Sequence, residues 1–107
     1  MSSQTTKELR VTANENAKRI MYLAKEFLIN NDSVEVVAGT AGAIVAIRAA
    51  ETLKRLGYVS YSDIRTETNI VNYRRRTRVV IALNKTGQFK KLYDENEANR
   101  KKLQEQN

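Results

Sequence analysis

The spacing of apolar residues in this chain alternates between two periods, and that succession constrains the fold more than any other feature of the sequence. Residues 8–12 alternate polar and apolar side chains, which predicts a short, half-buried strand. Asn14 is a suitable helix N-cap, and apolar residues then recur at three- and four-residue spacing as far as 30–32. Residues 33–38 predict a second strand that is buried for most of its length.

The glycine loop 39–42 breaks this strand and precedes a second predicted helix, which begins near Thr40 or Ala41 and ends with Gly57 as its C-cap. The apolar residues of this helix fall on two tracks, namely Ile44, Ile47 and Ala50, or Val45 and Ala49, together with Leu53 and Leu56. Two tracks on one short helix predict burial on two sides. We therefore expect the helix to pack on its own sheet and also to meet a partner chain.

The period returns to two in residues 63–71 and 79–83, which predict two further strands. The basic stretch 72–78 separates them, so the simplest arrangement is a β-hairpin with arginines at its tip. The chain is then charged and helix-prone from about residue 88 to residue 106. Its apolar residues lie mainly in the first turns, which predicts a docked start followed by a fraying helix.

The predicted order is β-α-β-α-β-β with a C-terminal helical extension, which is an α+β fold of the α/β-sandwich kind. Parallel connections through helices, followed by an antiparallel hairpin, give a four-stranded mixed sheet with two helices on one face. The 107 residues suit one domain. We expect a flexible N-terminus over residues 1–6, one folded domain over 7–85 and a charged C-terminal helix or tail over 86–107.

The composition of the chain argues against an enzyme. It contains no cysteine and no histidine, which excludes thiol chemistry and removes the commonest general base and metal ligand together. Its carboxylates are scattered, since Asp32 and Glu35 flank one predicted strand while Asp63 and Glu67 flank another. No Gly-Lys-Ser/Thr follows the glycine loop, so a nucleotide P-loop is rejected. We expect a non-enzymatic protein with no cofactor, metal or small-molecule substrate.

The charge of the chain predicts a polyanionic partner. Nineteen Lys and Arg residues against 12 Asp and Glu residues give a formal net charge of +7, which favours salt-dependent association with nucleic acid. No apolar run reaches the roughly 20 residues of a membrane span. The N-terminus lacks the charged-then-apolar layout of a secretion signal. We therefore expect an intracellular protein without a membrane partner.

The sharpest functional pattern is the run Arg74-Arg75-Arg76 with Arg78, at the tip of the predicted hairpin. Guanidinium groups bridge phosphate oxygens bidentately, and the neighbouring Tyr73 offers a stacking surface for an unpaired base. The alternative is a solvated turn that keeps an edge strand unpaired. Because an uninterrupted triple arginine repels itself, we favour nucleic-acid contact.

Two other segments are candidate phosphate contacts. Lys18 and Arg19 begin the outward face of the first helix, where they either contact nucleic acid or pair with Glu15 as ordinary surface residues. The loop 39–42 presents backbone N–H groups at the start of the second helix, or supplies the glycine torsions of a strand-to-helix turn. We expect the loop to do both.

The ordered set of segments resembles eukaryotic Alba proteins over roughly residues 7–85. The resemblance is carried by Glu8-Leu9-Arg10-Val11-Thr12, by Ile20-Met21-Tyr22-Leu23-Ala24-Lys25, by Val36-Val37-Ala38-Gly39-Thr40-Ala41-Gly42-Ala43-Ile44 continuing to 50–55, and by the hairpin 64–84. It implies a fold like the C-terminal domain of bacterial initiation factor three. It also implies a dimer that binds DNA, RNA or both.

The resemblance implies three contact regions, namely 14–19, 39–43 with a basic residue nearby, and 73–78. The candidate nucleic-acid-binding residues are Arg74, Arg75, Arg76, Arg78, Tyr73, Lys18, Arg19, Asn14, Gly39, Thr40, Gly42 and Arg48. This chain departs from archaeal members in two ways: it has Asn14-Glu15 where they often carry a lysine pair, and its hairpin connection is shorter than their long arms.

We therefore predict a non-catalytic binder of RNA, DNA or both that contacts the phosphate backbone with little sequence specificity. The resemblance to eukaryotic members favours RNA. We expect a homodimer, or a heterodimer with a related Alba chain, in chromatin or a ribonucleoprotein of the cytoplasm, the nucleus or both. The alternative is a protein-interaction or assembly subunit of an RNA-processing ribonucleoprotein, whose C-terminal helix grips a partner.

Overall fold

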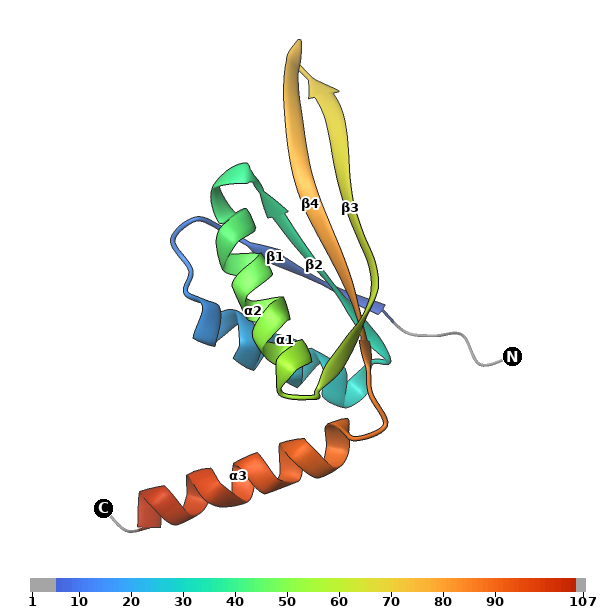
Figure 1. Cartoon of the computed structure of the whole chain (residues 1–107). Coiled ribbons are helices and arrows are strands. Elements are labelled where there is room, and N and C mark those ends of the chain that lie inside the picture. The colour runs from blue at the N-terminus through green and yellow to red at the C-terminus, as the bar shows by residue number, and fades with distance from the viewer. Residues whose placement is uncertain (1–5, 106–107) are drawn as a thin grey trace.

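The computed structural model describes residues 6–105 of the chain (Figure 1). Its elements are β1 (Thr6–Val11), α1 (Ala17–Asn30), β2 (Ser33–Gly39), the 3-10 turn η1 (Thr40–Gly42), α2 (Ala43–Arg55), β3 (Val59–Val71), β4 (Arg74–Lys85) and α3 (Phe89–Glu105). This order confirms the predicted α+β succession with its C-terminal helix. Of the N-terminus expected to be flexible, residues 1–5 lie outside the described residues and Thr6 begins β1; residue 106, the predicted end of the last helix, also lies outside them.

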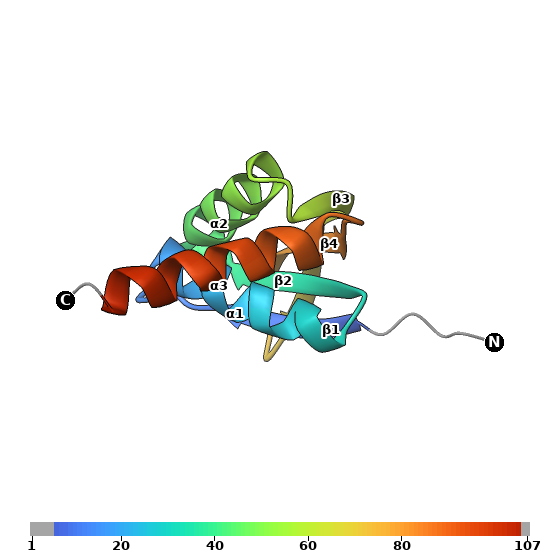
Figure 2. The same cartoon turned by 90° about the horizontal axis from the view of Figure 1, so that it is seen from below.

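The strands form one mixed sheet in the order β1-β2-β4-β3. β1 and β2 are parallel because α1 carries the chain back between them, whereas β4 is antiparallel to both β2 and β3. Figures 1 and 2 show α1 and α2 on the same face of this sheet, with α3 lying across the lower end of the two helices. The predicted mixed sheet with two helices on one face is thus confirmed.

The core lies between the sheet and the two helices. It is built from alternate residues of the strands and one side of each helix, chiefly Leu9, Val11, Val34, Val36, Ala38, Ile81 and Leu83 with Ile20, Ala24, Leu28, Ala46, Ala49, Ala50 and Leu53. Only part of the apolar set expected on α2 is buried within the single chain. Ala49, Ala50 and Leu53 are buried, but Ile44 and Ile47 remain 64% and 47% exposed. These two isoleucines lie outside the core.

The helix ends are fixed by local hydrogen bonds. α1 begins after the N-cap Asn16, whose side-chain oxygen accepts from the Arg19 backbone N–H at 2.8 Å. The prediction of Asn14 as the cap is wrong, because the Glu15 N–H bonds back to the Thr12 carbonyl at 3.3 Å and this extra turn delays the helix. Gly57 terminates α2 as expected, with φ of +93° one residue beyond the C-cap.

The first turns of α3 dock against the helical layer. Phe89 is buried, with its ring edge-on to Tyr58 at 5.8 Å and stacked with Tyr93 at 5.9 Å. The Tyr93 hydroxyl donates to Glu26 of α1 at 3.0 Å. The docked start is thus as expected. The residues from Ala98 to Leu103 are exposed and remain helical, and the fraying of this stretch stays a prediction.

The hairpin differs most from the prediction. Its strands pair as far as Val71 and Arg74, and the turn is the dipeptide Asn72-Tyr73, with φ of 52° and 64°. The predicted hairpin is formed and the connection is short, but the prediction that residues 72–78 lie between the strands is wrong, because the arginines belong to β4. Beyond the pair formed by Gly39 and Arg78, only β3 and β4 continue, and they project from the body as an arm, residues 68–77 (Figure 1).

Candidate nucleic-acid interface

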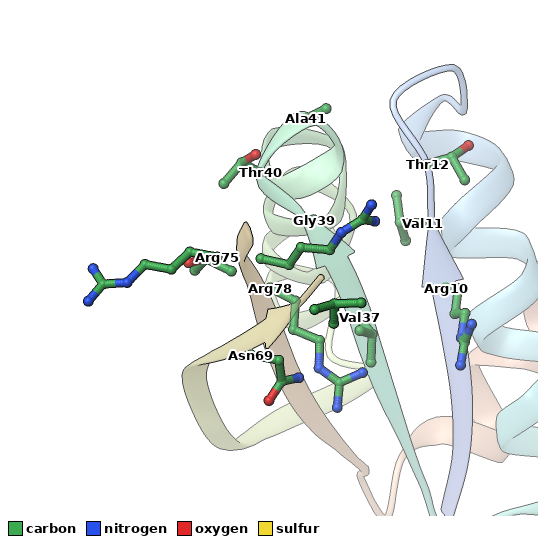
Figure 3. Close-up of a pocket in the computed structure, with 13 residues that line it drawn as sticks. Arg10, Val11, Thr12, Val37, Gly39, Thr40, Ala41, Asn69, Arg75 and Arg78 are labelled. Atoms are coloured by element: carbon green, nitrogen blue, oxygen red, sulfur yellow. The ribbon is translucent and has the colours of Figure 1, made fainter. Parts of the chain in front are cut away.

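Three segments meet at the end of the molecule from which the arm projects. Because β1 and β2 are parallel and Val11 pairs with Ala38, the loop 12–16 and the turn η1 leave the sheet at the same end (Figure 1). Between these segments and the arm lies an open cleft of about 930 Å³. It is lined by Arg10, Val11, Thr12, Val37, Gly39, Thr40, Ala41, Asn69, Val71, Arg75, Arg76, Thr77 and Arg78 (Figure 3).

The strand register decides which way each arginine faces. Arg74, Arg76 and Arg78 alternate along β4 and share the sheet face that the helices leave open. Arg75 faces the other side, opposite Ile70 of β3. Figure 3 shows the side chains of Arg75 and Arg78 pointing away from each other. The arginines of this run therefore lie on both faces of the sheet, an alternation that a strand imposes and a loop does not.

The distal arginines are free of acidic partners. The arm contains Arg74, Arg75 and Arg76 and no Asp or Glu. All three side chains are exposed, and none of the ion pairs among residues 6–105 includes them. The far end of the arm thus carries a charge of +3 that no acidic side chain among the described residues neutralises.

Arg78, by contrast, belongs to an ion-pair network at the base of the arm, which we call the base network (Glu35, Asp63, Arg65, Glu67 and Arg78). Arg78 binds one oxygen of Glu67 through Nη2 at 2.6 Å and Nε at 2.7 Å, and Arg65 binds the other through Nε at 3.0 Å. Arg65 also reaches Asp63 at 3.2 Å and Glu35 at 3.6 Å. Hydrogen bonds from Arg65 and Arg78 hold the pKa of the Glu67 carboxyl below its ordinary value.

Tyr73 occupies the tip of the arm. Its relative exposure is 102%, and its φ of 64° lies in the left-handed region that bulky residues rarely adopt. Nothing from the protein covers either side of its ring at this exposure. The side chain is available to an outside planar group.

The two glycines of the loop 39–42 differ in accessibility. Gly39 is exposed, and a Cβ built there would meet nothing within 4 Å. Gly42 is buried, and a Cβ there would lie 2.7 Å from the Val11 carbonyl oxygen. Thr40 between them is exposed and lines the cleft. The structure therefore places Gly39 and Thr40 at the cleft and Gly42 against β1.

The remaining predicted residues do not line the cleft. Asn14, Lys18 and Arg19 are exposed around the start of α1, and Arg48 is exposed on α2. Within residues 6–105 no ion pair joins Glu15 to Lys18 or Arg19, so the surface pairing considered for them is not formed. Glu15 instead accepts from the Thr12 hydroxyl at 3.3 Å.

Three polar residues of the cleft lie outside the contact regions predicted from the sequence, namely Arg10, Thr12 and Asn69. Arg10 alternates with the core residues Leu9 and Val11, which indicates that it faces away from the helices. Only the pairing of β1 beside β2 brings it to the cleft, and no local pattern contains that information.

A second exposed feature lies on the other side of α2. Glu51 accepts a hydrogen bond from the Tyr61 hydroxyl, so this face of α2 borders β3. Ile44 and Ile47 lie seven and four residues before Glu51 on the same face, and Ile64 of β3 is 57% exposed. We call Ile44, Ile47 and Ile64 the isoleucine patch.

The described residues carry neither a membrane helix nor a metal centre. Within residues 6–105, no helix combines the length and apolar character of a bilayer crossing. The same residues bring together no group of three or more Asp, Glu, His or Cys side chains that would hold a metal ion.

Comparison with known proteins identifies the fold. No protein-family model and no curated protein matches the sequence. The crystal structure of ALBA1 from Trypanosoma brucei superimposes with a TM-score of 0.80 at 20% identity, covering 99% of this chain and 92% of that one. Alba from Thermoplasma volcanium gives a TM-score of 0.53 at 16% identity, covering 72% of this chain and all of the other (100%). With four strands, two covering helices and a projecting hairpin in the same arrangement, this chain has the Alba fold.

Proposed function

We propose that this chain is a non-catalytic nucleic-acid-binding protein of the Alba family. The observation that carries the proposal is the unneutralised arginine run of the arm, Arg74 to Arg76, beside a cleft that also contains Arg10. Phosphate groups spaced along a nucleic-acid strand match several guanidinium groups that face different directions. Because these guanidinium groups face different directions, they suit phosphates spaced along the backbone better than one base edge, and we infer contacts mainly to the backbone.

The cleft supplies neutral donors as well as charge. Thr40 offers a hydroxyl and its own backbone N–H beside the open space at Gly39. Together with Thr12 and Asn69, these groups suit phosphate or ribose oxygens that thread between the arm and the body. Lys18, Arg19 and Arg48 extend the positive charge along the helical side.

We infer that the chain acts as a dimer through the isoleucine patch. Two of its three side chains come from the helix whose double apolar track predicted a partner, and all three are about half-exposed or more. Association would bury them and bring two arms into one assembly, which raises avidity without any new contact to nucleic acid. A homodimer and a heterodimer with a related Alba chain are both compatible with this patch.

RNA with unpaired bases is the favoured ligand. Tyr73 has a fully exposed ring at the end of a charged arm, and base stacking on such a ring adds about 1–3 kcal/mol in single-strand complexes. The positions of Arg74 and Arg76 on the same arm then place phosphate-binding groups next to the stacked base.

Substituting Arg74, Arg75 and Arg76 together with alanine tests the proposal. A control variant replaces Lys90, Lys91 and Lys102 of α3, which removes the same charge far from the cleft. Affinity for single-stranded RNA, duplex RNA and duplex DNA is measured between roughly 50 and 200 mM salt. The arginine variant should bind single-stranded RNA at least tenfold more weakly, with a salt slope lower by about two, since each lost contact contributes about 0.7.

The control variant should lose much less affinity than the arginine variant. Equal losses of affinity in the two variants would show that the arginines act only through the overall charge of the protein. Unchanged affinity and slope in the arginine variant would favour the alternative function, an assembly subunit of a ribonucleoprotein.

A further inference from the structure

We propose that in the free protein Glu67 pairs with Arg78 in the position that a phosphate takes in the complex. Nucleic acid then binds by displacing Glu67 from Arg78. This inference rests on the proposed function. It assigns Glu67 as the residue that sets the affinity of the cleft, although Glu67 itself does not line it.

Arg78 already binds an anionic oxygen with two of its guanidinium nitrogens. Two nitrogens of its guanidinium converge on a single Glu67 oxygen, at 2.6 and 2.7 Å. Arg78 is also a cleft residue, whereas the other arginine of the base network, Arg65, is not. Arg78 therefore lines the cleft and at the same time pairs with the carboxylate of Glu67.

Arg78 has free space on the side opposite Glu67. Across the strand pair its neighbour is Gly39, where a built Cβ meets nothing within 4 Å. Rotation of the flexible arginine side chain away from Glu67 therefore carries the guanidinium toward Gly39 and Thr40 without a clash at that position. There it would lie beside the backbone of η1 and the other donors of the cleft.

Glu67 keeps a partner after such an exchange. Its second carboxylate oxygen is bound by Arg65 at 3.0 Å, a contact that does not involve Arg78. The Arg78 and Glu67 side chains are 40% and 30% exposed, and an ion pair with that exposure is weak compared with several simultaneous phosphate contacts. Release of Arg78 therefore leaves no buried, unpaired charge.

The contact between Arg78 and Glu67 lowers the affinity for nucleic acid because of the net charge of the base network. The base network contains two arginines and three carboxylates, so its net charge is −1 while Glu67 is ionised. With the distal arm at +3, nucleic acid is drawn first to Arg74, Arg75 and Arg76, and Arg78 adds its contact only after it has changed partner. Wild-type affinity is thus lower than the number of arginines implies.

The test is Glu67→Gln, which keeps the shape of the side chain and removes its charge. Asp63→Asn is the matched control, because it removes the same charge from the same network but leaves the pair of Arg78 and Glu67 intact. Each variant is titrated with a single-stranded oligouridylate of about 20 nucleotides, and Glu67→Gln is also combined with Arg78→Ala. Circular dichroism melts establish that every variant is folded.

We expect Glu67→Gln to tighten binding about three- to fivefold at low salt, with a salt slope steeper by up to about one. Asp63→Asn should change affinity by less than about twofold, and Glu67→Gln should give no gain when Arg78 is alanine. An equal gain from Asp63→Asn, or a gain that survives without Arg78, would overturn the exchange in favour of general electrostatics. No gain from a folded Glu67→Gln variant would overturn it too, whereas failure of the wild type to bind would refute the proposed function itself.

Discussion

Replacing Gly42 with alanine is expected to destabilise the fold, because η1 passes over the end of β1 at this residue. The added Cβ would lie 2.7 Å from the Val11 carbonyl oxygen and 3.3 Å from the Thr12 carbonyl carbon. Both atoms belong to the backbone, so neither can rotate away as a flexible side chain would. The torsions of Gly42, φ −96° and ψ −1°, are open to alanine, so the effect comes from crowding alone.

The size of the effect follows from two opposing terms. Crowding of this kind in a packed interior costs about 1–3 kcal/mol, and the smaller conformational entropy of unfolded alanine returns about 0.4–1 kcal/mol. The net loss should be about 1–2 kcal/mol, which lowers Tm by roughly 5–15 °C for a domain of this size.

Gly39→Ala is the control, since it lies three residues away with φ of −71° and no atom within 4 Å of its Cβ position. It should melt within a few degrees of the wild type. Urea and thermal unfolding of both variants are followed by circular dichroism at one protein concentration, because dimer formation makes Tm depend on concentration. Wild-type stability in Gly42→Ala, or an equal loss in Gly39→Ala, would refute the close packing of η1 on β1.

Three other perturbations test separate parts of the account. Ile44→Asp with Ile47→Asp should convert a dimer to a folded monomer in sedimentation; a wild type that is already monomeric, or a variant that still dimerises, contradicts the isoleucine patch. Tyr73→Gly should preserve stability, because Asn-Gly suits this turn. It should weaken binding to single-stranded RNA about tenfold and binding to duplex DNA by less than twofold; equal losses of affinity would exclude stacking. Burial and the hydrogen bond to Glu26 raise the pKa of Tyr93 to about 12, so the folded state keeps this proton while the unfolded chain loses it near pH 10. Stability should therefore fall as the pH rises from about 10 to about 12, and Tyr93→Phe should reduce both this decline and the late step in the ultraviolet tyrosine titration; an identical titration would contradict the assignment.

The alternating periods were sufficient to predict the architecture because burial dictates them. Residues 33–38 and the helix that follows are buried on defined faces, so their patterns survive in the sequence. The start of β3 was missed for a physical reason. A register shift between Tyr61 and Asp63 inserts one extra residue, so Tyr61 and Ile64 face the same side although three positions separate them. The alternation breaks there, so a prediction from the two-residue spacing of apolar side chains starts the strand only after the break.

The arm could not be predicted from hydropathy, since both of its faces are exposed. Ile70 is 72% exposed, and arginines continue the strand through backbone pairing that depends little on side-chain polarity. The sequence identified the arginine run and the glycine loop as candidate sites. Their convergence with Arg10 depends on register and strand order, which emerge only when β1, β2 and β4 pair.

The most direct test of the account is a map of the residues that nucleic acid contacts. The amide chemical shifts of the ¹⁵N-labelled full chain are followed during titration with single-stranded oligouridylate. We predict that the largest changes fall together in residues 12–19, 39–42 and 68–78, with little change along the exposed part of α3. Changes centred on α3, with the arm unaffected, would contradict a nucleic-acid interface at the arm and cleft.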